Sequence, residues 1–227
     1  MNSSEKMKRA TGEYAVRYIQ PGLVIGIGTG STVFYFIQAL AKKVNEGLQI
    51  KAVATSKQSK ELAEQLGITI TDLNEVDNIS ITIDGADEAD GNLQLIKGGG
   101  GALLQEKMVA AASDRLIVIA DEDKYVKQLG RFPLPVEVIP YGWKQTQKHI
   151  LDISAIEIVL REKNGQPFIT DHGHYILDCH FEAIKNPAEL SMALNSIPGV
   201  VENGLFINMA NEVVLGKADG TVEIINR

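Results

Sequence analysis

The chain has 227 residues, of which 44% are hydrophobic and 22% charged, and its formal net charge is -7. This is enough apolar sequence for a substantial core, in one large domain or two small ones. The negative charge argues against a broad nucleic-acid-binding surface, so we expect no nucleic-acid partner. No uncharged apolar run reaches the roughly 18 residues of a transmembrane helix. The N-terminus does not resemble a signal peptide, and we expect a cytoplasmic protein without membrane contact.

The first part of the chain alternates amphipathic helices with short apolar strands. Helices are predicted at about residues 3–19, 31–44, 59–66 and 102–112, and strands at residues 23–27, 50–54, 68–70, 79–83 and 116–120. Such alternation is typical of an α/β fold. We therefore predict a Rossmann-like, mostly parallel sheet with helices on both faces.

The pattern changes after Gly130, where two prolines at 133 and 135 break regular structure. Strands at residues 136–139, 156–160, 175–179 and 200–207 and helices at 143–150 and 187–195 follow in a β-α-β-β-α-β order, and residues 212–225 read as a hairpin. We predict a Rossmann-like catalytic domain from residues 1–130 and 208–227. Residues 131–207 would form a smaller α+β, ferredoxin-like domain at an oligomer interface.

Three glycines, one at 26 in the first predicted strand and two at 28 and 30 after it, precede a helix. The spacing departs from a dinucleotide fingerprint, and no acidic residue ends the strand at 50–54 to hold a ribose hydroxyl. A tight turn that needs glycine is a second alternative. We favour a third, a cradle for a monophosphate or sugar, in which Thr29, Ser31 and Thr32 supply hydroxyls and the helix supplies N–H groups.

An acidic cluster, Asp84-Gly85-Ala86-Asp87-Glu88, directly follows the strand at 79–83. Open α/β sheets bind ligands at the carboxyl ends of their strands. A Mg²⁺ site and an ordinary turn are the alternatives. Because three acidic side chains end an apolar strand, we favour a functional site.

Lys97 and four successive glycines, Gly98 to Gly101, lie between an apolar segment and the helix at 102–112. A flexible linker has no purpose inside a domain, so we predict an active-site loop whose amides approach a ligand closely. Glu106 falls on the first turns of the following helix. Lys124 either faces the same crevice or is a solvated lysine after the strand at 116–120. Asp171-His172-Gly173-His174 reads as a polar turn rather than a metal site, because a third ligand is missing.

Taken together, Gly28 to Thr32, Asp84 to Glu88 and Lys97 to Leu103, with Glu106 after them, closely resemble the type A ribose-5-phosphate isomerases. The resemblance extends along the whole chain and includes Phe132 to Val138 and Ile197 to Val201. It implies a homodimeric or homotetrameric enzyme that uses no metal or cofactor and interconverts two pentose phosphates, ribose 5-phosphate and ribulose 5-phosphate.

The resemblance also implies roles for particular residues. Glu106 would move the proton between C1 and C2, with Asp84, Lys97 and Asp87 as further catalytic groups. The sugar phosphate would contact a larger set that includes a lysine of the first helix: Lys8, Thr29, Gly30, Ser31, Thr32, Asp84, Gly85, Ala86, Asp87, Lys97, Gly98, Gly99, Gly100 and Lys124. The alternatives are a related sugar-phosphate isomerase or deaminase, and a sugar-phosphate-sensing domain. The sensor would need a DNA-binding element, and none is evident in the sequence.

Overall fold

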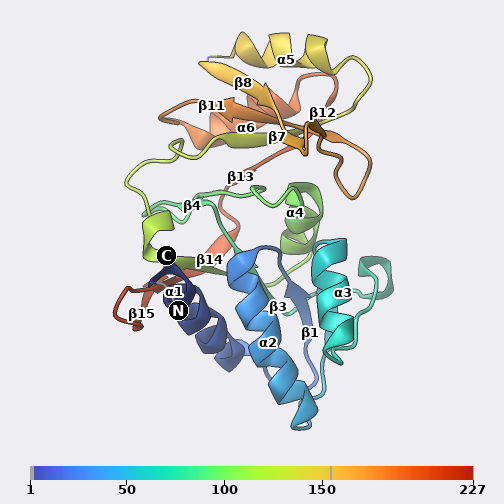
Figure 1. Ribbon diagram of the computed structural model, residues 1–227, viewed down its shortest axis with the longest axis vertical. Helices are drawn as coiled ribbons and strands as arrows, with labels where there is room; N and C mark the ends of the chain where they lie inside the picture. The colour runs from blue at the N-terminus through green and yellow to red at the C-terminus, as the bar shows by residue number, and fades with distance from the viewer. Residues whose placement is uncertain (1–2, 154, 227) are drawn as a thin grey trace.

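A six-stranded sheet forms the centre of the lower part of the molecule in the computed structural model, which describes residues 3–153 and 155–226 (Figure 1). The strand order is β15-β14-β6-β3-β1-β2. All neighbouring strands run parallel except β14 and β15, which form a hairpin. The strands span Val24–Ile27 (β1), Lys51–Ala54 (β2), Ile81–Gly85 (β3), Leu116–Asp121 (β6), Ala210–Gly216 (β14) and Val222–Asn226 (β15).

Helices cover both faces of this sheet, as predicted. Along β6, Ile117 and Ile119 pack into the core beneath α1, α2 and α3, whereas Leu116 and Val118 pack on the opposite face with Ala110 of α4. This alternation follows from the two-residue period of a strand. The helices span Ser3–Ala15 (α1), Ser31–Asn45 (α2), Lys57–Gln65 (α3) and Leu103–Ala111 (α4), and the 3-10 turns span Val16–Tyr18 (η1), Leu73–Glu75 (η2) and Glu122–Lys124 (η3).

A second, four-stranded sheet lies above α4 in Figure 1 and has the order β12-β7-β11-β8. Every pairing in it is antiparallel. Its elements are β7 (Leu134–Val138), α5 (Trp143–Leu151), β8 (Glu157–Leu160), β11 (Tyr175–His180), α6 (Pro187–Asn195) and β12 (Val200–Asn203). This order confirms the predicted ferredoxin-like unit. The boundaries proposed for the two domains stay a prediction.

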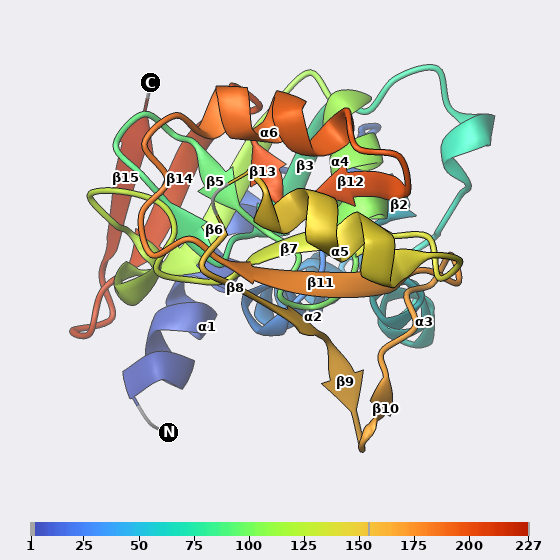
Figure 2. The same ribbon diagram turned by 90° about the horizontal axis from the view of Figure 1, so that it is seen from above.

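Two small sheets complete the fold. One is β13-β5-β4, from Leu205–Phe206, Leu95–Ile96 and Glu88–Ala89. The other is a hairpin of β9 (Glu162–Lys163) and β10 (Gln166–Pro167), which projects from the body of the molecule (Figure 2). None of the described helices has both the length and the apolar character needed to cross a lipid bilayer.

Three local predictions were wrong. The strand expected at 200–207 is interrupted at Gly204, whose N–H donates to Pro135 and whose carbonyl accepts from the Lys97 N–H, so the chain passes from one sheet to another. At residues 68–70 only an isolated bridge forms, between Ile70 and Ala52. The first α-helix ends at Ala15 and continues as a 3-10 turn.

Candidate active site

The carboxyl ends of the parallel strands converge on one edge of the main sheet. Asp84 is the fourth residue of β3, and its neighbour Gly28 follows β1. Asp84 Oδ1 accepts hydrogen bonds from the N–H groups of Thr29 (3.0 Å) and Gly85 (2.7 Å). The carboxylate is fully buried and is held rigidly by the backbone of two loops.

A buried ammonium group joins Asp84 to Glu106. Lys97, which follows β5, is 2% exposed, and its Nζ lies 3.0 Å from Asp84 Oδ2 and 3.0 Å from Glu106 Oε1. The same Nζ donates to the Gly85 carbonyl at 2.6 Å. Burial alone lowers the pKa of Lys97, but the two carboxylates outweigh it and raise that pKa above its ordinary value, so the lysine stays charged.

Glu106 lies on the first turns of α4 and is 4% exposed. Its Oε2 is buried and has no hydrogen-bond partner among the described residues. Burial, and then the nearby charge of Asp84, raise the pKa of Glu106 to about 8, against the opposing effect of Lys97. A carboxyl group with this pKa can both accept and return a proton near neutral pH.

The glycine-rich loop after Lys97 binds Asp87, the second carboxylate of the acidic cluster. The Gly99 N–H donates to Asp87 Oδ2 at 2.7 Å. Burial raises the pKa of Asp87, and the Gly99 N–H, Lys97, Lys124 and Arg161 oppose that shift. A side chain at Gly99 would place its Cβ 2.5 Å from Asp87 Oδ1, so the close approach requires glycine.

The opposite wall of the site is the N-terminus of α2. Gly30 has φ of 113° and stands at the N-cap position without a side-chain cap, and Ser31 is the first residue of the helix. Uncapped N–H groups and the helix dipole favour an anion at this point. Thr29 faces inward, where its hydroxyl bonds to those of Thr55 (2.7 Å) and Ser56 (2.8 Å).

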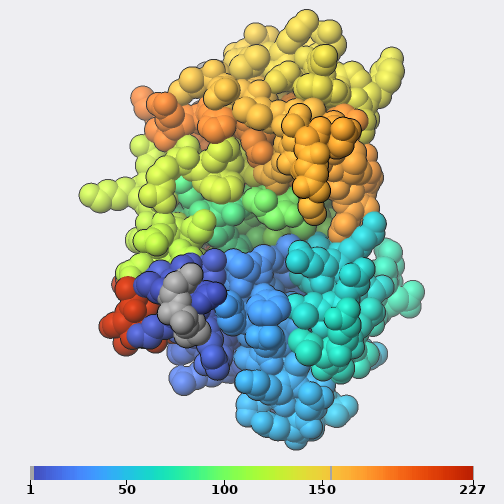
Figure 3. All heavy atoms as spheres, viewed as in Figure 1, coloured from blue at the N-terminus to red at the C-terminus, as the bar shows by residue number. Residues whose placement is uncertain are grey.

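These segments enclose one cavity of about 130 Å³. In Figure 3 the green residues, which include the glycine-rich loop, lie between the blue helices and the orange upper layer. The cavity is lined by Lys8, Thr29, Gly30, Ser31, Thr32, Gly85, Ala86, Asp87, Lys97, Gly98, Gly99, Gly100, Glu106, Asp121 and Lys124. All the predicted site residues therefore meet here except Asp84, which lies behind the wall and acts on the cavity through Lys97.

Two residues near the site were missed by the sequence analysis. Asp121 is the last residue of β6 and Asp84 is the next-to-last residue of β3, so the same positional argument could have found it. Burial raises its pKa, and Lys124 and Lys8 oppose that shift. Arg161, which lies between β8 and β9, donates to the carbonyls of Gly98 (2.8 Å) and Gly99 (3.1 Å). No local sequence pattern predicts such a contact, because the partners are far apart along the chain.

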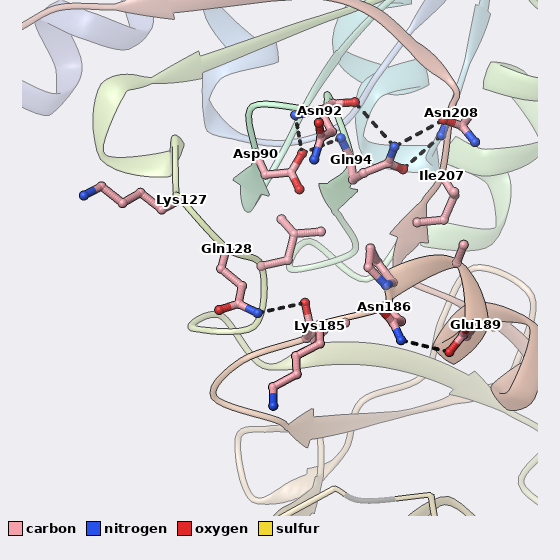
Figure 4. Close-up of a pocket in the computed structure, with 14 residues that line it drawn as sticks. Asp90, Asn92, Gln94, Lys127, Gln128, Lys185, Asn186, Glu189, Ile207 and Asn208 are labelled. Atoms are coloured by element: carbon pink, nitrogen blue, oxygen red, sulfur yellow. Dashed lines mark hydrogen bonds between the residues drawn. The ribbon is translucent and has the colours of Figure 1, made fainter.

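A larger hollow of about 650 Å³ lies between the β4–β5 segment and α6 (Figure 4). Its polar side chains are largely bonded among themselves, as between Gln94 and Asn208 (3.2 Å) and between Asn186 and Glu189 (3.0 Å). Among the described residues that line this hollow, there is no buried cluster of titratable groups comparable to that around Lys97.

The Asp171 to His174 segment forms a turn, in which Gly173 N–H donates to Thr170 O. Within residues 3–153 and 155–226, no three His, Cys, Asp or Glu side chains gather closely enough to hold a metal ion.

Comparison with known proteins identifies the family. The family described as Ribose 5-phosphate isomerase A (phosphoriboisomerase A) matches residues 51–220. The chain belongs to the ribose 5-phosphate isomerase A family. It is 52% identical to Ribose-5-phosphate isomerase A of Bacillus mycoides, over 96% of this chain and 98% of that relative. It is 49% identical to that of Dinoroseobacter shibae, over 99% of this chain and 89% of the relative.

Solved structures of ribose 5-phosphate isomerases have the same fold. The enzyme from Plasmodium falciparum superposes with a TM-score of 0.95 at 39% identity, covering 98% of this chain and 99% of its own. A D-ribose-5-phosphate isomerase in complex with phospho-erythronic acid also gives 0.95, at 41% identity, with both chains fully covered. These matches confirm the resemblance seen in the sequence motifs. The function of the family is the interconversion of ribose 5-phosphate and ribulose 5-phosphate.

Proposed function

We propose that the chain performs this isomerisation through an enediolate, with Glu106 as the single base that moves the proton between the two carbons. The observation that carries the proposal is the state of Glu106. It is a buried carboxyl group that lines the cavity, has a free Oε2, and lies 3.0 Å from the ammonium group of Lys97. A buried base beside an ammonium group is suited to proton abstraction next to a carbonyl, because the cation can stabilise the negative charge that forms on the carbonyl oxygen.

The reaction on the open-chain sugar would need two proton transfers at carbon and one between the substrate oxygens. Glu106 removes the C2 proton of the aldose, the C1–C2 double bond forms, and the carbonyl oxygen takes up negative charge. Glu106 then returns the proton to C1, while the C2 hydroxyl loses its proton and becomes the ketose carbonyl. The O2 proton passes to O1, so atoms and charge balance without any external oxidant.

Lys97 would stabilise the negative charge as it moves onto the substrate oxygens, since its pKa is raised and it stays an ammonium group. A preorganised donor in such a site is worth ~3 kcal/mol of barrier. Asp84 would hold Lys97 in place. Asp87, or Asp84, would assist opening of the sugar ring.

The phosphate would lie at the other wall, against the start of α2. Ser31 and Thr32 offer hydroxyl and N–H groups there, and Lys8 and Lys124 line the same cavity. The complex of the related isomerase with phospho-erythronic acid supports a sugar-phosphate ligand for this site. A homodimer or homotetramer and a cytoplasmic location stay predictions.

The test is a pair of matched Glu→Gln variants assayed with ribose 5-phosphate while ketose formation is monitored. Glu106→Gln should lower kcat at least 100-fold, because a general base typically contributes about 10²–10⁴-fold. Glu75→Gln, at an exposed position in η2, is the control and should behave as the parent. A Glu106→Gln protein with parental kcat would remove this residue from the mechanism.

A further inference from the structure

The base of the β9–β10 hairpin contacts the glycine-rich loop from outside the cavity. Arg161 immediately precedes β9, Phe168 immediately follows β10, and the Phe168 N–H donates to the Arg161 carbonyl at 2.8 Å. The Arg161 side chain reaches the loop carbonyls described above. The Phe168 ring lies against Gly101, where an added Cβ would approach its Cε1 to 2.5 Å. One small structural element thus holds both ends of the loop.

Arg161 is itself fixed before it reaches the loop. Its Nε donates to Asp178 Oδ2 at 2.9 Å and its Nη2 bonds to Asp178 Oδ1. This is the paired geometry that a planar guanidinium makes with a carboxylate. The Arg161 side chain is 15% exposed, and Asp178 lies on β11, a central strand of the four-stranded sheet. The remaining nitrogen, Nη1, is therefore aimed at the loop by a rigid scaffold.

The contact holds two peptide planes of a tight turn, in which the Gly98 carbonyl also accepts a hydrogen bond from the Gly101 N–H at 2.9 Å. In a planar trans peptide the C=O of one residue and the N–H of the next point in opposite directions. Arg161 holds the Gly98 carbonyl, so the Gly99 N–H on the same plane points away from it, to Asp87 Oδ2 at 2.7 Å. Arg161 also holds the Gly99 carbonyl, which turns the Gly100 N–H away from the guanidinium.

The Gly100 N–H has no acceptor in the part of the chain that the structure describes, and Gly100 lines the cavity. Its Cα lies close to Thr29, whose N–H holds Asp84, because an added Cβ at Gly100 would lie 3.4 Å from Thr29 Cγ2. A donor left free at this point is suited to a substrate oxygen.

We propose that Arg161 is a positioning residue for the isomerisation, which sets the glycine-rich loop so that the Gly99 N–H holds Asp87 and the Gly100 N–H donates to the reacting end of the sugar. Arg161 does not touch the substrate and acts through the two peptide planes. Because the donor is aimed at the oxygens that gain charge, its loss affects the chemical step more than substrate binding. The inference rests on the proposed function of this site.

The test uses Arg161→Ala and Arg161→Lys, with Arg115→Ala as the matched control. Arg115 pairs with Glu212 at 3.6 Å but precedes β6 at the end of the sheet away from the cavity. For Arg161→Ala we expect kcat to fall about 10- to 100-fold with KM within about 3-fold, since the donor is misaligned rather than deleted. Lysine should restore part of the loss, and Arg115→Ala should retain parental kcat.

A second readout separates positioning from general destabilisation. Phospho-erythronic acid carries a carboxylate at its non-phosphate end, so its inhibition constant should rise about 10-fold in Arg161→Ala, whereas inhibition by inorganic phosphate should not change. Parental kcat in Arg161→Ala, or equal weakening of both inhibitors, would overturn the proposal. If Arg161→Ala has the parental kcat and Glu106→Gln is inactive, the proposal for Arg161 fails but the proposed function stands. Only an active Glu106→Gln variant would contradict the proposed function.

Discussion

Replacing Lys97 by methionine tests the charge arrangement of the site most directly. The substitution keeps most of the side-chain volume but leaves Asp84 (0% exposed) and Glu106 (4% exposed) without their shared cation. Removing one partner of a buried ion pair typically costs 3–5 kcal/mol, and here two carboxylates lose theirs, so we expect unfolding free energy to fall by about 4 kcal/mol. The loss of an oxyanion donor should lower kcat a further 10²–10³-fold, roughly.

The pH dependence of this loss has a definite sign. The pKa of Glu106 is raised to about 8 from its ordinary 4.5, so the folded protein binds a proton that the unfolded chain releases. Its favourable contribution is present below pH 4.5 and is lost as pH rises toward 8. Without Lys97 the pKa rises further, because the ammonium group lowers it in the parent. The Lys97→Met defect should therefore be smaller at pH 6 than at pH 9.

Urea unfolding at these two pH values, together with steady-state kinetics, measures both effects. Adding Glu106→Gln to Lys97→Met removes one uncompensated carboxylate, so the double variant should be more stable than Lys97→Met at pH 9. Equal unfolding free energies for Lys97→Met and the parent at both pH values, or no recovery in the double variant, would refute the reasoning about buried charge.

Three further predictions concern the surrounding groups. Asp84→Asn removes a charge that raises the pKa of Glu106, so the acidic limb of the kcat/KM profile should move to lower pH; an unmoved or upward-shifted limb contradicts this. Gly99→Ala forces the loop away from Asp87 and should lower kcat/KM about 100-fold, as a ~1 Å misplacement does. The control is Gly91→Ala, whose added Cβ would lie 3.4 Å from Tyr125 Oη, and it should leave kcat/KM unchanged. EDTA should leave turnover unchanged, and inactivation reversed by Mg²⁺ would mean that the acidic cluster binds metal.

The sequence predicted those parts of the fold and of the site that depend on local patterns, but not those that depend on distant partners. Continuous apolar runs located the strands of the main sheet because these strands are parallel and buried, and Asp84 could be placed at the carboxyl end of its strand. The break at Gly204 has a local signal in the turn-forming pair Asn203-Gly204, but the hydrogen bonds to Pro135 and Lys97 that take the chain into another sheet have none. Local sequence does not encode such partners.

The same distinction applies within the site. Glycine spacing and acidic residues after strands predicted the lining of the cavity, since both are local features of loops. Arg161 pairs with Asp178, which is 17 residues away in sequence, and its contacts with the glycine-rich loop join segments more than 60 residues apart. Its recognition needed the arrangement of the two sheets.

The charge balance of the buried cluster explains why the reaction suits a low-dielectric site. Asp84, Lys97 and Glu106 carry a net charge of about one negative unit when Glu106 is ionised. In the proposed mechanism, that negative charge moves to the substrate oxygens near Lys97 when Glu106 takes the C2 proton, and the total charge of the enclosed region does not change. No additional ion is desolvated during the step, so the fixed dipoles and the ammonium group need only favour one location of the charge over another. A glutamate with an ordinary pKa would hold the charge too strongly for this transfer, and burial beside Asp84 corrects that.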